Sequence, residues 1–138
     1  MKLSWPDLIL PPINLWSLPM TTTEHDHQVN LMSWAAMQTK ALPELNLLFA
    51  IPNGGHRHPA TGAKLKAEGV KAGVPDIALM VAKKGYHGLF IELKTEKKSS
   101  KLSDVQINWL NALTEQGYKA VECRGWNDAR NTILDYLN

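Results

Sequence analysis

Three residues in the middle of the chain have the types and spacing that metal-dependent hydrolysis requires. Asp76 opens one apolar run, and Glu92 and Lys94 lie two residues apart in the next. Side chains two apart leave the same face of a strand, and a hairpin of the two runs brings Asp76 to that face as well. Carboxylate oxygens suit Mg²⁺ or Mn²⁺, and a lysine beside them can orient the attacking water. The pattern predicts a metal site for phosphodiester hydrolysis. A solvated strand face is the alternative, because Glu-x-Lys alone is a common pattern.

Turn and capping signals show which elements must position these residues. A threonine cap, glycine stops and a serine–glutamine capping box separate the apolar runs. We expect a helix that starts after Thr22 or Thr23 and ends before Pro43, a strand over 46–51, a short helix over 60–68, strands over 76–82 and 89–95, a helix from Ser103 to Gly117, a strand over 118–123, and a last helix capped by Asn127.

The order of these elements predicts the fold class. A strand, a helix and a second strand between 89 and 123 form a crossover unit, whose strands run parallel with a right-handed connection. The strands at 76–82 and 89–95 are joined by a short turn and run antiparallel. We therefore expect a single α/β domain with a mixed central β-sheet flanked by helices on both faces.

Length and composition indicate an ordinary globular protein of one domain. The chain has 138 residues, of which 44% are hydrophobic and 20% charged. A single cysteine, Cys123, excludes an intramolecular disulfide and a cysteine-based zinc site, and it favours a reducing compartment. No apolar run approaches the roughly 18 residues of a membrane span, so we expect no membrane association. These features predict a cytoplasmic protein.

The first twenty residues are unusually apolar for a chain terminus. Asp7 and four prolines interrupt the segment, and no small-residue cleavage site follows, which argues against a signal peptide. We interpret residues 1–20 as an extended apolar arm that includes Trp5 and Trp16. The arm either packs on its own domain or is exchanged between subunits.

The net charge of +2 conceals an uneven distribution. Residues 56–101 hold ten basic and four acidic side chains, whereas the rest of the chain carries a net charge of −4. A basic segment around Asp76 and Glu92 predicts that a polyanion binds over a metal site. Surface lysines that only promote solubility are the alternative.

The same residues resemble the PD-(D/E)XK nuclease superfamily, through Pro75-Asp76 followed after fifteen residues by Glu92-Leu93-Lys94. The finer pattern is similar to the stand-alone VRR-NUC nucleases, which occur in phage and bacterial genomes, so the resemblance implies a bacterial or phage-infected cell. This pattern comprises Pro52-Asn53-Gly54-Gly55, the run from Leu65 to Asp76, the Glu-Leu-Lys triplet and Gln106. The resemblance covers roughly residues 24–125. It implies a restriction-endonuclease-like core, a VRR-NUC-like nuclease domain over 21–138, and DNA hydrolysis with Mg²⁺ or Mn²⁺.

The resemblance also implies roles for single residues. Asp76 and Glu92 would be metal ligands, together with the main-chain carbonyl of Leu93. Lys94 would position the nucleophilic water and offset charge in the transition state. Glu24, on the first helix, would be a further acidic ligand.

Two of the implied site residues have a local alternative. Asp26 lies two residues after Glu24, and either acid also stabilises a helix start. Gln28 lies four residues after Glu24, on the same helical face, which favours Glu24. Gln106 either points into the site or only caps the helix by pairing with Ser103.

Basic residues near the motif are candidates for DNA contact. Lys66 and Lys71 precede Asp76 and are the preferred candidates for phosphate contacts. Asn53 and Arg57 lie in the glycine-bounded turn, and the histidines on either side of Arg57 are weaker candidates.

The combined interpretation is a structure-selective DNA endonuclease. Small stand-alone members of the family look like resolvases, in which a symmetric dimer cuts both strands of a four-way (Holliday) junction. One domain without a separate sequence-reading module must select DNA by shape, and two-fold symmetry in the protein would match the junction. The alternatives are a nuclease for flaps, forks or single-stranded ends, a non-catalytic nucleic-acid-binding module, and a sequence-specific restriction enzyme.

Overall fold

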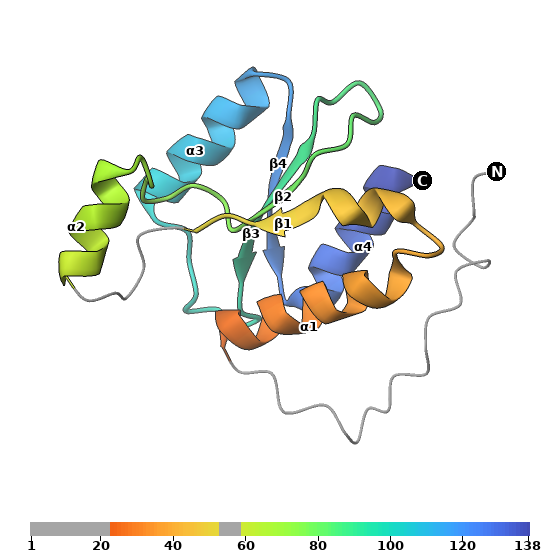
Figure 1. The fold of residues 1–138 in the computed structure, drawn as a ribbon, viewed down its shortest axis with the longest axis horizontal. Coiled ribbons are helices and arrows are strands. Elements are labelled where there is room, and N and C mark those ends of the chain that lie inside the picture. Colours follow the sequence, from red (N-terminus) through yellow and green to blue (C-terminus); the bar gives the residue numbers. More distant parts are fainter. Residues whose placement is uncertain (1–22, 53–58) are drawn as a thin grey trace.

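The computed structural model describes residues 23–52 and 59–138, and the grey trace in Figure 1 marks the rest. The apolar arm and the predicted turn with Asn53 and Arg57 lie outside the described residues. The elements in chain order are α1 (Glu24–Gln38), the 3₁₀ helix η2 (Pro43–Leu47), β1 (Leu48–Ala50), α2 (Pro59–Ala67), β2 (Ile77–Leu79), β3 (Leu89–Lys94), α3 (Asp104–Glu115), β4 (Lys119–Arg124) and α4 (Trp126–Leu137).

The four strands form one mixed sheet in the order β1-β2-β3-β4. The strands β1 and β2 pair antiparallel, as do β2 and β3, with Ile77 opposite Ile91. The crossover through α3 makes β4 parallel to β3, with Glu92 beside Glu122 and Lys94 beside Arg124. The predicted α/β fold with a mixed sheet is confirmed.

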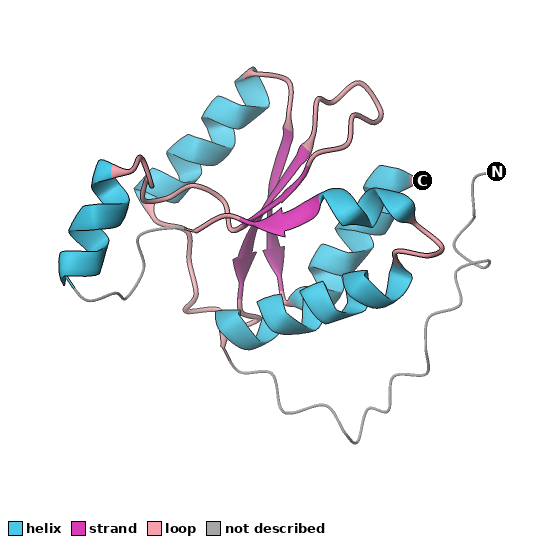
Figure 2. Cartoon of the chain, viewed as in Figure 1, coloured by secondary structure: helices cyan, strands magenta, loops and turns pink. Residues whose placement is uncertain are grey.

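The two faces of the sheet have different roles. Leu89, Ile91 and Leu93 of β3 point into the hydrophobic core, where they are buried against α1 and α4. The alternate residues of β3, Phe90, Glu92 and Lys94, therefore point to the opposite face, on which α3 lies. Figure 2 shows the helices on both sides of the sheet. The polar residues of interest thus occupy the face away from the main core.

Local capping explains where α1 and α3 begin. Thr23 is the N-cap of α1, and its Oγ1 accepts a hydrogen bond from the Asp26 N–H at 3.1 Å. Ser103 and Gln106 form the predicted capping box of α3. Within α3, Leu110 is buried against the rest of the domain.

The start of α4 differs from the prediction. Asn127 is not the cap: the helix begins at Trp126, with Gly125 as its N-cap residue and no side chain of its own sequence capping it. The Nδ1 atom of the buried His27 in α1 accepts the Trp126 N–H at 3.0 Å instead. A partner 99 residues away replaces the local cap, which no local pattern indicates.

The first two strands are shorter than predicted. In each case part of the expected strand forms other backbone interactions. Pro43 opens a 3₁₀ helix that occupies the first part of the expected strand over 46–51, so β1 has only three residues. Beyond Leu79 the chain leaves the ladder, and the Val81 carbonyl accepts a hydrogen bond from the Tyr136 hydroxyl of α4. None of the helices in the described ranges has the length and apolarity to cross a membrane.

The loop before β2 packs closely on α3, which gives a stability prediction. Gly73 has φ +84°, and a Cβ there would lie 2.3 Å from Cγ1 of Val105. We expect Gly73→Ala to lower the free energy of unfolding by about 1–3 kcal/mol in urea titrations, from steric overlap and backbone strain. Gly62→Ala is the control, because Gly62 lies in α2 with open space around it, and alanine should stabilise that helix. Equal stability of Gly73→Ala and wild type would contradict this packing.

Candidate active site

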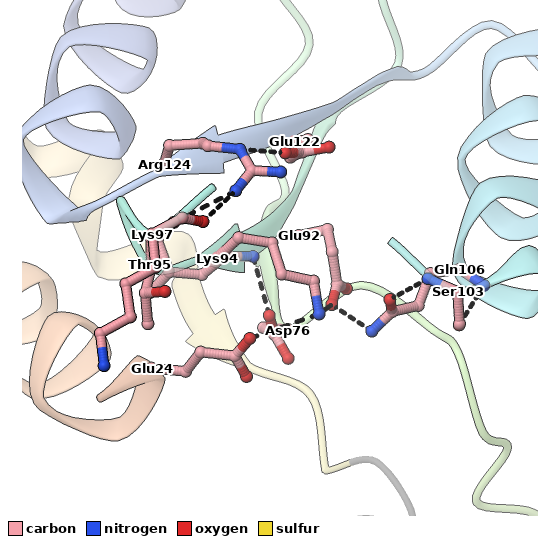
Figure 3. A network of polar contacts seen from close by, with 11 residues as sticks. Glu24, Asp76, Glu92, Lys94, Thr95, Lys97, Ser103, Gln106, Glu122 and Arg124 are labelled. Carbon is pink, nitrogen blue, oxygen red and sulfur yellow. Dashed lines mark hydrogen bonds and ion pairs between the residues drawn. The ribbon is translucent and has the colours of Figure 1, made fainter. Parts of the chain in front are cut away.

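The structure brings the three motif residues together on the α3 face of the sheet (Figure 3). Continuing the β2–β3 register by one residue sets Asp76 beside Glu92. The Asp76 side chain also accepts the Leu93 N–H, at 2.8 Å from Oδ2. Lys94 Nζ lies 4.0 Å from Glu92 Oε1 and 3.3 Å from Glu24 Oε1. A neighbouring pair of acids, a lysine and a third acid from α1 thus share one site.

Glu92 is the most constrained member of the site. It is 2% exposed, and its Oε1 accepts a hydrogen bond of 2.7 Å from Gln106 Nε2. Its Oε2 is buried and has no hydrogen-bond partner among the described residues. Burial, followed by the negative charge of Asp76, raises the pKa of Glu92 to about 8, against the opposing effect of Lys94. The carboxyl group is therefore held where its charge is poorly compensated.

Gln106 has both of the roles that the sequence left as alternatives. Its backbone N–H donates to Ser103 Oγ at 3.2 Å, and its Oε1 accepts the Ser103 N–H at 2.9 Å. These bonds leave the amide nitrogen to donate to Glu92. The start of α3 therefore fixes the direction in which Glu92 points.

Pro75 explains why a main-chain oxygen beside the two acids lacks its usual ladder bond. The β2–β3 register, continued outward, places the buried Pro75 opposite Leu93. Proline has no N–H to donate, so the Leu93 carbonyl receives no ladder bond from that position. The Leu93 N–H is satisfied by Asp76 instead. The Pro-Asp pair thus ends the ladder and replaces one of its bonds with a side-chain bond.

The oxygen donors at this site fit a hard divalent cation. The donor set is the Asp76 carboxylate, the unpartnered Oε2 of Glu92 and the carbonyl of Leu93, which are the ligand types that Mg²⁺ and Mn²⁺ prefer. No group of three or more acidic, histidine or cysteine side chains converges for a metal within the described ranges. Glu24 is paired with Lys94, and its role as a ligand stays a prediction.

Two of the predicted DNA-contact residues, Lys66 and Lys71, are described, and they lie outside this cluster. Lys66 in α2 and Lys71 in the loop after it are exposed and line one open hollow with the small residues around them. The loop leads directly into Asp76. Asn53 and Arg57 are not among the described residues, so all four stay predictions.

Sequence reasoning overlooked a second pair of charged residues on the site face. Glu122 and Arg124 in β4 are the register partners of Glu92 and Lys94. Arg124 Nε lies 2.7 Å from Glu122 Oε1 (Figure 3). The available signal was the repetition of the Glu-x-Lys spacing as Glu-x-Arg in the following parallel strand.

Comparison with known proteins agrees with this geometry. The fold and the site define a nuclease-type domain, and the family model of the VRR-NUC domain matches residues 20–127. The chain therefore belongs to the VRR-NUC domain family. A solved structure described as a VRR_NUC domain protein is 32% identical, with a TM-score of 0.68 over 86% of this chain and 90% of that chain. The search of curated proteins found no match. The resemblance inferred from the sequence is confirmed.

The raised pKa of Glu92 predicts a pH-dependent stability difference. Between pH 4.5 and about 8 the folded state keeps a proton that the unfolded state has lost, so this group's contribution to stability falls as pH rises. Without divalent cations, Glu92→Gln should be more stable than wild type at pH 9, on the order of 1–3 kcal/mol, and about equal at pH 4.5. Thermal unfolding in EDTA across this range measures the difference. A constant difference between the two proteins at all pH values would contradict the raised pKa.

Variants of Ser103 and Gln106 can separate the capping of α3 from the contact with Glu92. Ser103→Ala removes the hydroxyl cap and should cost about 1 kcal/mol of stability while leaving the Gln106–Glu92 bond in place. Gln106→Ala keeps that hydroxyl cap, which the backbone N–H of residue 106 donates, but removes the side-chain bonds to the Ser103 N–H and to Glu92, so it should also lower the rate of the nuclease reaction. Urea unfolding and single-turnover cleavage of the two variants measure these effects. Equal cleavage rates would show that the Glu92 contact has no functional role.

Proposed function

We propose that this protein is a structure-selective DNA endonuclease that hydrolyses phosphodiester bonds with Mg²⁺ or Mn²⁺. We further propose that it resolves four-way junctions as a symmetric dimer. The observation that carries the proposal is the buried Glu92 carboxylate, with one unpartnered oxygen beside Asp76 and an ammonium group 4.0 Å from the other. A purely structural role does not account for two adjacent acids on a buried sheet face.

The oxygen donors of the site have a direct use in this reaction. Asp76, Glu92 and the Leu93 carbonyl would hold the cation. When bound, a divalent cation supplies a water of lowered pKa and stabilises charge on the phosphate. Gln106 keeps the Glu92 carboxylate in its orientation through the 2.7 Å hydrogen bond. Preorganised donors of this kind need no rearrangement during the reaction.

Lys94 has a separate task in the proposed mechanism. It is 8% exposed, and Glu24 at 3.3 Å holds its ammonium group at the edge of the acidic pair. From there Lys94 can donate to the attacking water and offset negative charge that develops on the phosphate. Glu24 in turn positions Lys94, and it is available as a further oxygen ligand.

The charge distribution around the site supports the proposed selection of DNA by shape. The family match spans residues 20–127 and includes the basic stretch 56–101, whose net charge of +6 favours phosphate contact along a backbone. A two-fold symmetric dimer would present two such sites to the two strands of a junction. Contacts of this kind depend on the path of the backbone and not on base identity.

The experiment is a cleavage panel with Mg²⁺ or Mn²⁺ on a four-way junction, a flap, a fork, a plain duplex and a single strand. Wild type should make paired, symmetric incisions in the junction. Glu92→Gln and Lys94→Ala should lose at least about 100-fold in rate, as expected when electrostatic stabilisation is removed, and should retain most of their DNA binding. Glu115→Gln is the matched control, because Glu115 is an exposed acid at the far end of α3.

The other outcomes separate the remaining hypotheses. Cutting confined to flaps, forks or free ends would overturn the junction assignment and keep the site. Absence of metal-dependent cutting with every substrate would favour a binding module. Light scattering measures the mass in solution, and a monomer on junction DNA would contradict the dimer.

A further inference from the structure

Glu122 and Arg124 in β4 are the register partners of Glu92 and Lys94 in the parallel strand β3. In-register neighbours in a parallel sheet are about 4.8 Å apart and leave the same face. Arg124 is therefore next to Lys94, on the side away from Asp76. The side chain of Arg124 is 36% exposed, whereas that of Lys94 is 10% exposed. The guanidinium group thus lies at the accessible rim of the site.

The Arg124 guanidinium is held in one orientation by three acceptors. Nε lies 2.7 Å from Glu122 Oε1, and Nη1 donates to the carbonyls of Lys97 at 3.1 Å and Thr95 at 3.4 Å. Figure 3 shows the group turned toward these two carbonyls, directly after the end of β3. The described residues provide no hydrogen-bond acceptor for Nη2. The protein thus engages Nε and Nη1 and leaves Nη2 available to donate.

We propose that Arg124, oriented by Glu122, binds a phosphate of the DNA backbone next to the scissile phosphate, on the β4 side of the site. The inference rests on the proposed nuclease function and adds a specific anion contact to it. A guanidinium group is planar and always charged, and it matches the geometry of phosphate oxygens. Immobilisation by Glu122 reduces the entropy that would be lost on binding.

The loop that Arg124 holds supports this assignment. The carbonyls of Thr95 and Lys97 belong to the segment after Lys94, which also carries the exposed Lys98 and Lys101. Anchoring the two carbonyls fixes the start of the backbone segment that carries these lysines. The predicted contacts Lys66 and Lys71 precede Asp76, on the β2 side. Basic groups on both sides would allow one backbone to cross the site.

The test is DNA binding in EDTA, measured by fluorescence anisotropy with a labelled four-way junction over a range of salt concentrations. Arg124→Gln should weaken binding about tenfold and reduce the slope of log K against log salt by about 1. Arg124→Lys keeps the charge but not the fork, so its slope should stay close to wild type while its affinity falls. Arg130→Gln is the matched control, because Arg130 stacks on Trp126 in α4 on the other face and should have no effect.

A wild-type measurement keeps the proposal testable if a variant fails to fold. The chain has three arginines, Arg57, Arg124 and Arg130. Junction DNA should protect Arg124 from modification by phenylglyoxal, followed by mass spectrometry, and should leave Arg130 reactive. Unchanged affinity and salt slope in Arg124→Gln, or equal reactivity of Arg124 with and without DNA, would overturn the proposal. A loss of cleavage alone would mean that Arg124 only positions the loop, which also overturns it.

These outcomes are distinct from those of the nuclease test. Arg124-dependent binding without any metal-dependent cleavage would support the phosphate contact and remove the nuclease function. Cleavage of the junction by wild type, together with unchanged DNA binding by Arg124→Gln, would support the nuclease function and remove the phosphate contact.

Discussion

The burial of a carboxylate at the centre of the sheet is the constraint on which the site depends. An ionised group out of water is costly unless other groups compensate its charge. Glu92 has one hydrogen bond, one ammonium group 4.0 Å away and a second acid beside it, so the compensation is incomplete. The neighbouring elements supply what compensation there is: α3 through Gln106 and β3 itself through Lys94. The fold therefore maintains a local site in which the charge of the ionised Glu92 carboxylate is only partly compensated, in agreement with the raised pKa of this group.

The site lies where several elements end. Asp76 immediately precedes β2, Lys94 is the last residue of β3, Gln106 is in the first turn of α3, and Glu24 is the first residue of α1. Ends of elements leave backbone groups that need partners, and the side chains of the site provide some of them. The Leu93 N–H bonded to Asp76 and the Ser103 N–H bonded to Gln106 are two such cases. Completion of secondary structure and construction of the site thus use the same residues.

Most of the fold could be predicted from the sequence because its signals are local. Capping residues, glycine stops and the crossover order gave the α/β class and the mixed sheet, and the spacing of Asp76, Glu92 and Lys94 gave their common face. What the sequence did not reveal depends on distant partners. The start of α4 depends on His27, the early end of β2 on Tyr136, and the position of Arg124 on strand pairing. A pattern of neighbouring residues holds no information on the first two contacts, whereas the repeated Glu-x-Lys and Glu-x-Arg spacing was a signal for the third.

The parallel pairing of β3 with β4 has a consequence for when the protein becomes active during its synthesis. Glu92 and Lys94 are made before α3 and β4, yet Glu92 is oriented by α3, and the Lys94 carbonyl accepts the Gly125 N–H just after β4. A crossover of this kind closes only after both strands exist, since non-local pairing must follow loop closure. A chain still being translated therefore holds the motif without the site. A nuclease activity would in this way be absent until most of the domain has left the ribosome.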